Sequence, residues 1–442
     1  MRRLSLTLDY RVKAQNLDMR HYILFLIVLI TTGLMVQSCH ETPVEPPLKT
    51  YPLHLSVTSD NTSAVLNWTT LTVSSFEEYI IVRSEDSIPD SPEPELVGSA
   101  TIVARIDQAD ESEFIDFAPP ISRSVYYKVY GKIGDRFLST PTVRTDLSIQ
   151  IIDLRVDISE INQAKDEFIG YDRANQILFI YNYRTEEIRV QKFIPHTNPI
   201  IRIGSYNSNN EIYLTDQSGV MYIYNYGNLN LVRKSNGFAQ PVDFIYDKGR
   251  FIIAAQSGSI FVMDRATMQI TDTDPGIINL RKLYPGERNG DELEILEIGT
   301  SQVNKYILEN NGISKVSSKT DIPGGFQLIT AGHPDGNQFI INGSGKIIDN
   351  ELQNVGGLED GVQFYNLLRY TEDGSKLFSA GFFLNKINLK FFDVEDDYDK
   401  ISENQITAFP INMFSDDEDV YLISVVFLNG GVRTVIFNYT IP

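Results

Sequence analysis

The sequence Phe179-Ile180-Tyr181-Asn182 is the first copy of a motif that recurs along the C-terminal part of the chain. The motif has two or three strand-forming, mostly apolar residues followed by one polar residue, and we call it the strand motif. Its later copies are Tyr222-Ile223-Tyr224-Asn225, Phe261-Val262-Met263-Asp264, Tyr306-Ile307-Leu308-Glu309, Lys346-Ile347-Ile348-Asp349, Lys390-Phe391-Phe392-Asp393 and Val435-Ile436-Phe437-Asn438. The polar residues of successive copies are separated by 43, 39, 45, 40, 44 and 45 residues. A strand-rich repeat with this period indicates a series of similar small sheets.

A period of about 40–45 residues, with several strands in each repeat, is typical of a β-propeller blade. The strand motif is then expected to be the third strand of each blade. Tight polar turns should lead into the second strands, at Asp172-Arg173-Ala174-Asn175, Asn207-Ser208-Asn209-Asn210, Asp247-Lys248-Gly249, Asp335-Gly336 and Asp373-Gly374. Turns such as 216–219 and 257–258 join second to third strands, and a more polar fourth strand follows, as at 186–193. The polar residue of each motif should accept hydrogen bonds from nearby backbone N–H groups.

Residues 148–442 therefore predict a β-propeller whose ring has to close. Only four residues follow Asn438, too few for a fourth strand in the last blade. The spare strand 149–156, Ile-Gln-Ile-Ile-Asp-Leu-Arg-Val, is expected to supply the outer strand of that blade. The repeat resembles WD40-like and quinoprotein-like seven-bladed propellers, although it has no Trp-Asp dipeptide. Seven copies favour seven blades, with six or eight as alternatives.

Residues 51–147 predict a β-sandwich, because short alternating strands follow one another between turn residues. The expected strands are 53–56, 63–68, 79–83, 102–106, 126–131 and the region around Phe137. The only tryptophan, Trp68, ends the second strand, Asp116 precedes the cross-over, and Tyr127-Lys128-Val129-Tyr130-Gly131 follows. This series resembles a fibronectin type III domain. The resemblance implies a core tryptophan, a corner tyrosine at Tyr127 whose hydroxyl bonds to the backbone, and the role of a spacer.

Residues 1–38 have the pattern of an export signal. A basic segment with Arg2, Arg3 and Arg20 precedes an apolar run over 22–36, and Val36-Gln37-Ser38-Cys39 ends it. This ending resembles the signal of bacterial lipoproteins, with a variant that is typical of Bacteroidota, and implies that Cys39 carries the lipid. The alternative is a transmembrane anchor, but the run is shorter than the roughly 20 residues that span a bilayer. Cys39 is the only cysteine, so no intrachain disulfide can form. Residues 39–50 are a Pro-rich tether.

The charge of the chain limits its partners. The net charge is −20, and removal of residues 1–38, which hold five basic and two acidic residues, makes it −23. Nucleic acid is disfavoured as a partner because its phosphates would be repelled. The expected contact with the outer membrane is the lipid on Cys39. Glu41 and Glu45 partly resemble the signal that exports such lipoproteins to the cell surface, and the periplasmic face is the alternative.

Motifs with a chemical meaning are scarce. Gly343-Ser344-Gly345-Lys346 resembles part of a phosphate loop, but Ile347 replaces the required Ser or Thr, so a turn is expected. His196 and His333 fall in different repeats without metal-ligand spacing, so neither a metal site nor a cofactor is predicted. The acidic runs 393–399 and 416–419 lack the order of a calcium loop and are read as solvated turns. Four tyrosines are candidates for a sugar platform or for core packing: Tyr181, Tyr183, Tyr224 and Tyr226. Asp86-Ser87-Ile88 resembles an O-glycosylation site or is an ordinary loop.

No catalytic residues are predicted. The leading hypothesis is a non-catalytic, outer-membrane-anchored lipoprotein in which a spacer holds a propeller that binds a glycan or a protein. The second hypothesis is a propeller enzyme, a glycoside hydrolase or polysaccharide lyase, which would need two or three carboxylates, or His with Tyr and Arg, converging at the central funnel. The third is an envelope assembly factor on the periplasmic side.

Overall fold

A computed structural model describes residues 53–442 except 60–62, 118, 148, 278–280, 300–301, 311, 321–329, 342–344, 359–364, 384–385, 407 and 429–430. Within these residues the chain is built from β-strands and two short 3-10 helices, η1 (Pro94–Leu96) and η2 (Gln163–Lys165). The predicted all-β class is therefore confirmed. The signal segment, Cys39 and the tether lie outside the described residues. In the described part, no helix is long and apolar enough to span a bilayer.

The first part of the chain forms two antiparallel sheets. One has the order β1-β2-β5; the other has the order β4-β3-β6-β7, and β8 also pairs with β6. The strands are β1 (Leu55–Ser59), β2 (Ala64–Trp68), β3 (Phe76–Ser84), β4 (Thr101–Ile106), β5 (Glu113–Asp116), β6 (Ser124–Ile133), β7 (Arg136–Ser139) and β8 (Val143–Asp146). Trp68, Tyr79 and Tyr127 are buried, and the Trp68 and Tyr79 rings meet edge to face at 5.4 Å. Trp68 thus lies in the core on the second strand, as predicted.

The prediction that the Tyr127 hydroxyl bonds to the backbone is wrong. That hydroxyl donates its hydrogen bond to Oδ2 of Asp116 over 2.8 Å. Nη1 of Arg83 lies 2.9 and 2.7 Å from the two oxygens of the same carboxylate. A carboxylate is a stronger acceptor than a backbone carbonyl, so a buried charged pair beside Tyr127 attracts its hydroxyl.

The described residues of the rest of the chain form seven four-stranded antiparallel sheets, which we number one to seven. Sheet one contains β10 (Ile158–Asn162), β11 (Glu167–Asp172), β12 (Ile177–Asn182) and β13 (Glu187–Phe193). Sheet two contains β14 (Ile200–Tyr206), β15 (Asn209–Thr215), β16 (Met221–Asn225) and β17 (Leu231–Lys234). Sheet three contains β18 (Pro241–Asp247), β19 (Arg250–Ala255), β20 (Ser259–Asp264) and β21 (Ile270–Pro275). Sheet four contains β22 (Arg281–Asn289), β23 (Glu292–Gly299), β24 (Gln302–Glu309) and β25 (Gly312–Thr320). Sheet five contains β26 (Thr330–Gly332), β27 (Gln338–Ile341), β28 (Lys346–Asp349) and β29 (Asn354–Gly357). Sheet six contains β30 (Tyr365–Tyr370), β31 (Lys376–Phe383), β32 (Lys386–Asp393) and β33 (Asp399–Ile406). Sheet seven has the order β34 (Phe409–Asp416), β35 (Asp419–Leu428), β36 (Gly431–Thr440) and β9 (Ile149–Ile152).

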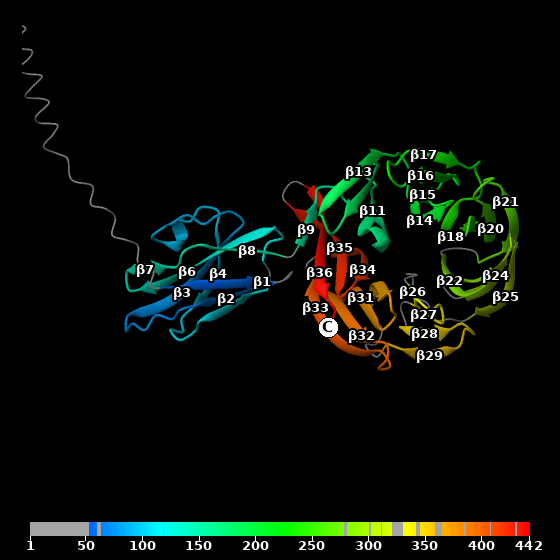
Figure 1. Cartoon of the computed structure of the whole chain (residues 1–442). Coiled ribbons are helices and arrows are strands. Elements are labelled where there is room, and N and C mark those ends of the chain that lie inside the picture. The colour runs from blue at the N-terminus through cyan, green and yellow to red at the C-terminus, as the bar shows by residue number, and fades with distance from the viewer. Residues whose placement is uncertain are drawn as a thin grey trace, which may run out of the picture. The chain divides into compact units, whose positions relative to one another are not determined.

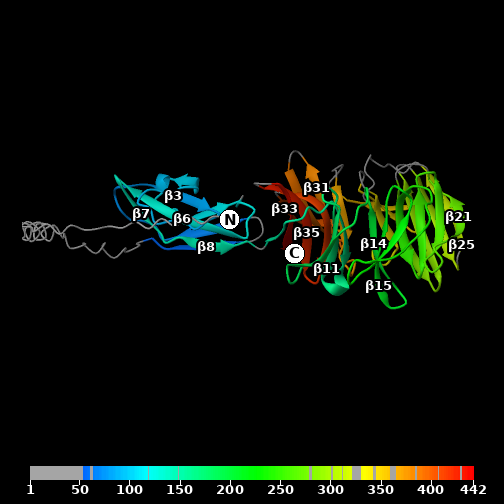
Figure 2. The same cartoon turned by 90° about the horizontal axis from the view of Figure 1, so that it is seen from above.

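The seven sheets follow one another around a ring (Figure 1). The first strand of each sheet lies on the inside of the ring and the fourth on the outside, and the view turned by 90° shows the strands running through its thickness (Figure 2). The first strands of sheets one and seven contact each other, as neighbours do elsewhere in the ring. Second strands such as β11 and β19 are buried along their whole length because neighbouring sheets cover both faces, whereas β13 and β17 are mostly exposed. This arrangement is compatible with a propeller-like fold.

The strand motif occupies the third strand of every sheet, as predicted. Its polar residue also has the predicted local role in most copies. Asn182 Oδ1 accepts from the backbone N–H groups of Arg184 and Thr185 at 3.0 and 2.8 Å, and Asn225 Oδ1 accepts from that of Gly227 at 2.9 Å. Similar bonds are made by Asp264, Asp349 and Asp393. In these copies the motif therefore ends the third strand by starting a turn.

One predicted turn has a different position. The turn at 172–175 joins the second and third strands of sheet one, and η2 leads into the second strand instead. Asp172 Oδ1 accepts a hydrogen bond from the N–H of Asn175 at 2.9 Å. A turn of this kind can precede a second strand or a third strand, so its sequence does not distinguish the two positions. The turns at 207–210, 247–249, 335–336 and 373–374 do precede second strands, as predicted.

The predicted closure of the ring is confirmed. β9 pairs antiparallel with β36, with Ile151 opposite Val435 and Ile149 opposite Phe437. The strand ends at Ile152, earlier than predicted, but the Val156 N–H donates to the buried Thr434 hydroxyl at 2.8 Å. Sheet seven therefore combines strands from both ends of the ring-forming segment.

Candidate binding cavity at the centre of the ring

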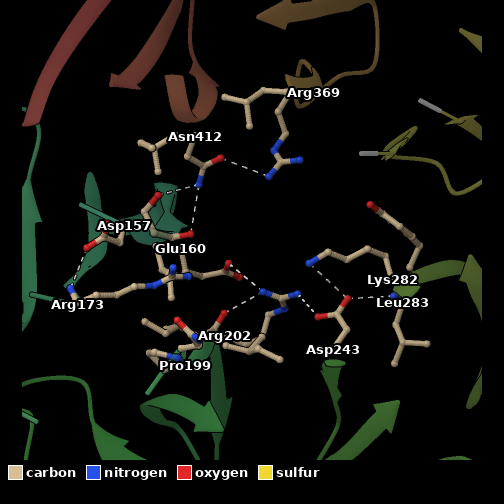
Figure 3. Close-up of a pocket in the computed structure, with 18 residues that line it drawn as sticks. Asp157, Glu160, Arg173, Pro199, Arg202, Asp243, Lys282, Leu283, Arg369 and Asn412 are labelled. Atoms are coloured by element: carbon tan, nitrogen blue, oxygen red, sulfur yellow. Dashed lines mark hydrogen bonds and ion pairs between the residues drawn. The ribbon is translucent and has the colours of Figure 1, made fainter. Parts of the chain in front are cut away.

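A cavity of about 580 Å³ lies at the centre of the ring and is lined largely by the first strands (Figure 3). Six of the seven sheets each contribute a polar side chain from the first strand, and we call these six residues the polar ring. They are Glu160, Arg202, Asp243, Lys282, Arg369 and Asn412. A cavity of this size accommodates a small-molecule ligand or one unit of a larger one.

Apolar residues form a second layer beside the polar ring. Ile158, Ile200 and Leu367 each precede a polar-ring residue by two positions, so they point to the same face of their strands. Two residues of a strand span about 7 Å, which sets the separation of the two layers. Pro199, Leu283 and Ile411 add to the apolar lining. The cavity thus has a charged zone and, nearer the beginning of the first strands, an apolar zone.

Asp243 is held firmly by its neighbours. Its side chain is 1% exposed, Oδ1 is 2.7 Å from Nη2 of Arg202, and Oδ2 accepts from the N–H of Leu283 at 3.0 Å. Nζ of Lys282 is 4.0 Å from the same Oδ2. Arg202 is fixed in turn, since its Nε donates to the Phe244 carbonyl at 3.1 Å. Both oxygens of Asp243 are therefore occupied by the scaffold.

Glu160 is in a different situation from Asp243. Its side chain is 29% exposed in the cavity, and its ion-pair partner among the described residues is Nη1 of Arg202 at 3.5 Å. Burial inside the ring raises the pKa of Glu160 despite the opposing charges of Arg202, Arg369 and Lys282, and the nearby Asp243 raises it further. Burial by itself lowers the pKa of the Arg202 guanidinium, but the negative charges of Asp243 and Glu160 outweigh this effect and raise the pKa. Glu160 is thus the carboxylate of the polar ring that is open to a ligand.

Arg369 is an exposed cation within the cavity. Its Nη1 donates to the Leu368 carbonyl at 3.2 Å and its Nη2 to Oδ1 of Asn412 at 3.3 Å. Asn412 is oriented by Ser159, whose hydroxyl accepts from Nδ2 at 3.0 Å. In the part of the chain that the structure describes, no carboxylate lies within ion-pair distance of Arg369.

The two histidines singled out in the sequence lie apart from this cavity. His196 is buried; its Nδ1 is 2.8 Å from Oδ2 of Asp216 and its Nε2 is 2.9 Å from the Tyr224 hydroxyl. His333 lies at the predicted turn, where Nδ1 is 2.6 Å from Oδ1 of Asp335 and Nε2 is 3.2 Å from the Gly374 carbonyl. Among the described residues, no group of three or more His, Cys, Asp or Glu side chains has the arrangement of a metal site.

The other candidate residues have structural positions. Tyr181, Tyr183, Tyr224 and Tyr226 are buried, as expected for core packing rather than a sugar platform. In the acidic run 416–419, Asp417 is 86% exposed, but Asp416 accepts from the Tyr183 hydroxyl at 2.9 Å and from Nη2 of Arg184 at 2.7 Å. That contact joins sheets seven and one, so the reading as a purely solvated turn is wrong for Asp416. Ser87 is exposed in a loop, and 343–344 lie outside the described residues.

The polar ring was not predicted from the sequence: the central funnel was expected to hold a site only in the enzyme hypothesis, and none of these six residues was identified. A signal was present, because the polar-ring residues recur in the first strands at a regular interval. The successive steps from Glu160 to Arg202, from Arg202 to Asp243 and from Asp243 to Lys282 are 42, 41 and 39 residues. A step of 87 residues, or two periods, leads to Arg369, and a step of 43 leads to Asn412. The strand motif shares this period but drew attention to the third strands, which face the neighbouring sheets.

At the level of sequence, no protein family and no curated protein matches the chain. In structure, the chain is similar to the crystal structure of Raptor from Chaetomium thermophilum, with a TM-score of 0.51 and 11% identity over 67% of this chain. The similar region spans 29% of the Raptor chain. Because 1287 solved chains match this architecture, the likeness supports the fold and carries no function.

Proposed function

We propose that this protein is a non-catalytic binding protein. In this proposal a fibronectin type III-like domain acts as a spacer, a seven-bladed β-propeller binds the partner, and a lipid on Cys39 anchors the chain at the outer membrane. The partner is a glycan or a protein of the cell envelope or its surroundings. The number of four-stranded sheets and their order around the ring support the seven-bladed reading.

The strand order of the first part supports the spacer. Sheets of order β1-β2-β5 and β4-β3-β6-β7 combine neighbouring and crossing strands in the way of immunoglobulin-like sandwiches. The buried Trp68 on β2 and the buried Tyr127 on β6 add to the resemblance. Neither residue is exposed to a ligand, which favours a structural role for this domain.

The observation that carries the proposal is the state of the two carboxylates in the polar ring. A glycosidase uses two carboxylates that both reach the substrate. Here Asp243 is 1% exposed and bonded through both oxygens. Asp157, which also lines the cavity, is 8% exposed and is bonded through both oxygens to Arg155 and to the N–H of Arg173, so Glu160 is the carboxylate that remains open to a ligand. The exposed Arg369 and the half-exposed Lys282 can bind a ligand without any chemistry.

The raised pKa of Glu160 favours a second candidate, an enzyme that uses this residue as a general acid. The two candidate functions differ in whether a polysaccharide is cleaved. Mature protein incubated with acidic and neutral polysaccharides should produce no new reducing ends and no unsaturated products. Product formation that is lost in Glu160→Gln would favour the enzyme.

Binding itself is tested with an immobilised lipid-free form, residues 40–442, exposed to a glycan array and to a solubilised envelope fraction. We expect a specific glycan or protein to be retained by the folded bait and not by the same bait after heat unfolding. Equal retention by both baits, or retention by neither, would contradict the proposed function.

A further inference from the structure

We propose that the central cavity binds a small organic carboxylate, with its carboxylate group held by Arg369 and Lys282 and its apolar part against Ile158, Ile200 and Leu367. This inference rests on the proposed function, which it deepens by naming the chemistry of the ligand. The carboxylate is a free acid or part of a larger partner, such as an acidic sugar or a peptide C-terminus.

Charge is the first argument. Asp243 is neutralised by Arg202 at 2.7 Å, and Asp157 at the edge of the cavity by Arg155 at 2.7 Å. Two cations, Lys282 and Arg369, then face one open carboxylate, Glu160. The cavity therefore has an excess of positive charge within a chain of net charge −20. Low-dielectric walls strengthen the attraction of such a site for an anion.

Geometry is the second argument. Arg369, Lys282 and Glu160 extend from three different first strands toward the same open space (Figure 3). The hydrogen bonds of Arg369 to the Leu368 carbonyl and to Asn412 are long, at 3.2 and 3.3 Å, and a guanidinium has five N–H groups, so donors remain for a ligand. A planar guanidinium matches the two oxygens of a carboxylate. The ammonium of Lys282, 44% exposed, supplies a second charge.

The apolar layer is the third argument. A bare inorganic anion would satisfy the two cations but would leave Ile158, Ile200 and Leu367 in contact with water. A ligand whose apolar part extends about 7 Å from its carboxylate would reach this layer. Removal of this apolar surface from water then adds to the affinity.

Glu160 makes the binding dependent on pH. The groups that face it are Arg202 from β14, Asp243 from β18, Lys282 from β22 and Arg369 from β30. Ionised Glu160 repels an incoming carboxylate, whereas protonated Glu160 donates a hydrogen bond to it. Affinity should therefore rise as the pH falls through the raised pKa of Glu160, until the ligand is itself protonated.

The test uses isothermal titration of the mature protein with four probes: hexanoate, acetate, inorganic phosphate and hexanol. We expect hexanoate to bind at least about tenfold more tightly than each of the others, because only hexanoate has both a carboxylate and an apolar chain. Arg369→Gln and Lys282→Gln should each weaken hexanoate at least about tenfold, the size expected for a lost charged hydrogen bond. Lys248→Gln, in the exposed turn between β18 and β19 and not among the residues that line the cavity, is the matched control and should leave the affinity unchanged.

Absence of hexanoate binding to the wild type would overturn the inference, as would wild-type affinity in both variants. Phosphate binding as tight as hexanoate would show a site for anions in general and would also overturn it. Both variants should keep the wild-type melting temperature. Because two positions are substituted separately, misfolding of one variant still leaves the other to decide the outcome. Because retention of an envelope partner is measured separately, loss of hexanoate binding with retained capture would refute this inference alone, and the reverse result would refute the proposed function alone.

Discussion

Glu160 and Asp243 are carboxylates of the same cavity with opposite environments. Asp243 has exchanged water for Arg202 and the N–H of Leu283, so its negative charge is compensated. Glu160 has lost part of its water and has gained one contact at 3.5 Å. The same type of group therefore stabilises the ring at one position and costs stability at the other.

We expect Glu160→Gln to stabilise the protein at neutral pH. The pKa of Glu160 is raised in the folded state, so the folded protein binds this proton more tightly than the unfolded chain does. The free energy of unfolding then falls as the pH rises above about 4.3, the ordinary value for Glu, and through the raised pKa. Glutamine has no charge to desolvate and removes this loss. Urea unfolding at several pH values should show a higher free energy of unfolding and a flatter pH dependence for the variant.

Asp243→Asn is the control for that prediction, because it changes the other carboxylate of the cavity in the same way. It leaves Arg202 without its close partner and should lower the free energy of unfolding by about 3–5 kcal/mol. If both variants shift the stability in the same direction, the contrast between the two carboxylates is wrong.

The pair Arg265–Glu211 fastens sheet three to sheet two at the residue scale. Arg265 Nε and Nη2 lie 2.9 and 2.6 Å from the two carboxylate oxygens, and both side chains are 6% exposed. Glu211→Ala should lower the free energy of unfolding by about 3–5 kcal/mol, because it leaves a buried guanidinium unpaired. Urea unfolding measures the change.

The matching exposed pair between neighbouring sheets is Lys248–Asp291, at 3.2 Å with side chains 52% and 94% exposed. Lys248→Ala should cost no more than about 1 kcal/mol, since water already solvates both charges. Equal effects of the two substitutions would mean that burial does not decide the strength of these contacts.

At the scale of elements, third strands were predictable and first strands were not. The strand motif is a local pattern: apolar residues fill the space between sheets and Asn or Asp starts the following turn, as at Asn182. A polar-ring residue such as Arg202 has a meaning only beside Asp243, 41 positions later in the sequence. That proximity is created by the closed ring. Tyr127 gives the same lesson, since its partner Asp116 is reached only through tertiary packing.

The seam between β36 and β9 should depend on the Thr434 hydroxyl. This hydroxyl accepts the Val156 N–H at 2.8 Å in a buried position just after β9. Thr434→Val has nearly the same shape but leaves the N–H without a partner, which should cost about 1–3 kcal/mol. Hydrogen exchange should accelerate first in β36. Thr434→Ser keeps the hydroxyl and should preserve the exchange rates of β36; if it behaves like the valine variant, lost packing rather than the hydrogen bond explains the effect.

At the scale of the whole molecule, the ring is closed by side chains as well as by strands. Gln150, on β9, donates from Nε2 to the Tyr183 carbonyl at 2.8 Å and accepts from the Tyr181 hydroxyl at 3.1 Å. Arg184 reaches Asp416 across the same boundary at 2.7 Å. Sheets one and seven are thus joined by buried and half-buried polar contacts, which hold the first strands around the cavity in place. A scaffold that is arranged before the ligand arrives lowers the entropic cost of binding, which is then limited mainly to exposed side chains such as Arg369 and Lys282.

The proposed anchor gives the last prediction. The signal resemblance makes Cys39 the lipidated residue, and a net charge of −23 disfavours direct adsorption of the mature chain to anionic lipid. Cys39→Ser should therefore move the protein from the membrane fraction to the soluble fraction and abolish incorporation of labelled palmitate. Ser38→Ala, next to it, keeps the small residue of the signal and should remain membrane-bound. Protease treatment of intact cells then separates the two faces: degradation of the wild type without lysis indicates the cell surface, and protection until lysis indicates the periplasmic side. Continued membrane association of Cys39→Ser would contradict the lipid anchor, because the proposed function attaches the protein to the membrane only through the lipid on Cys39.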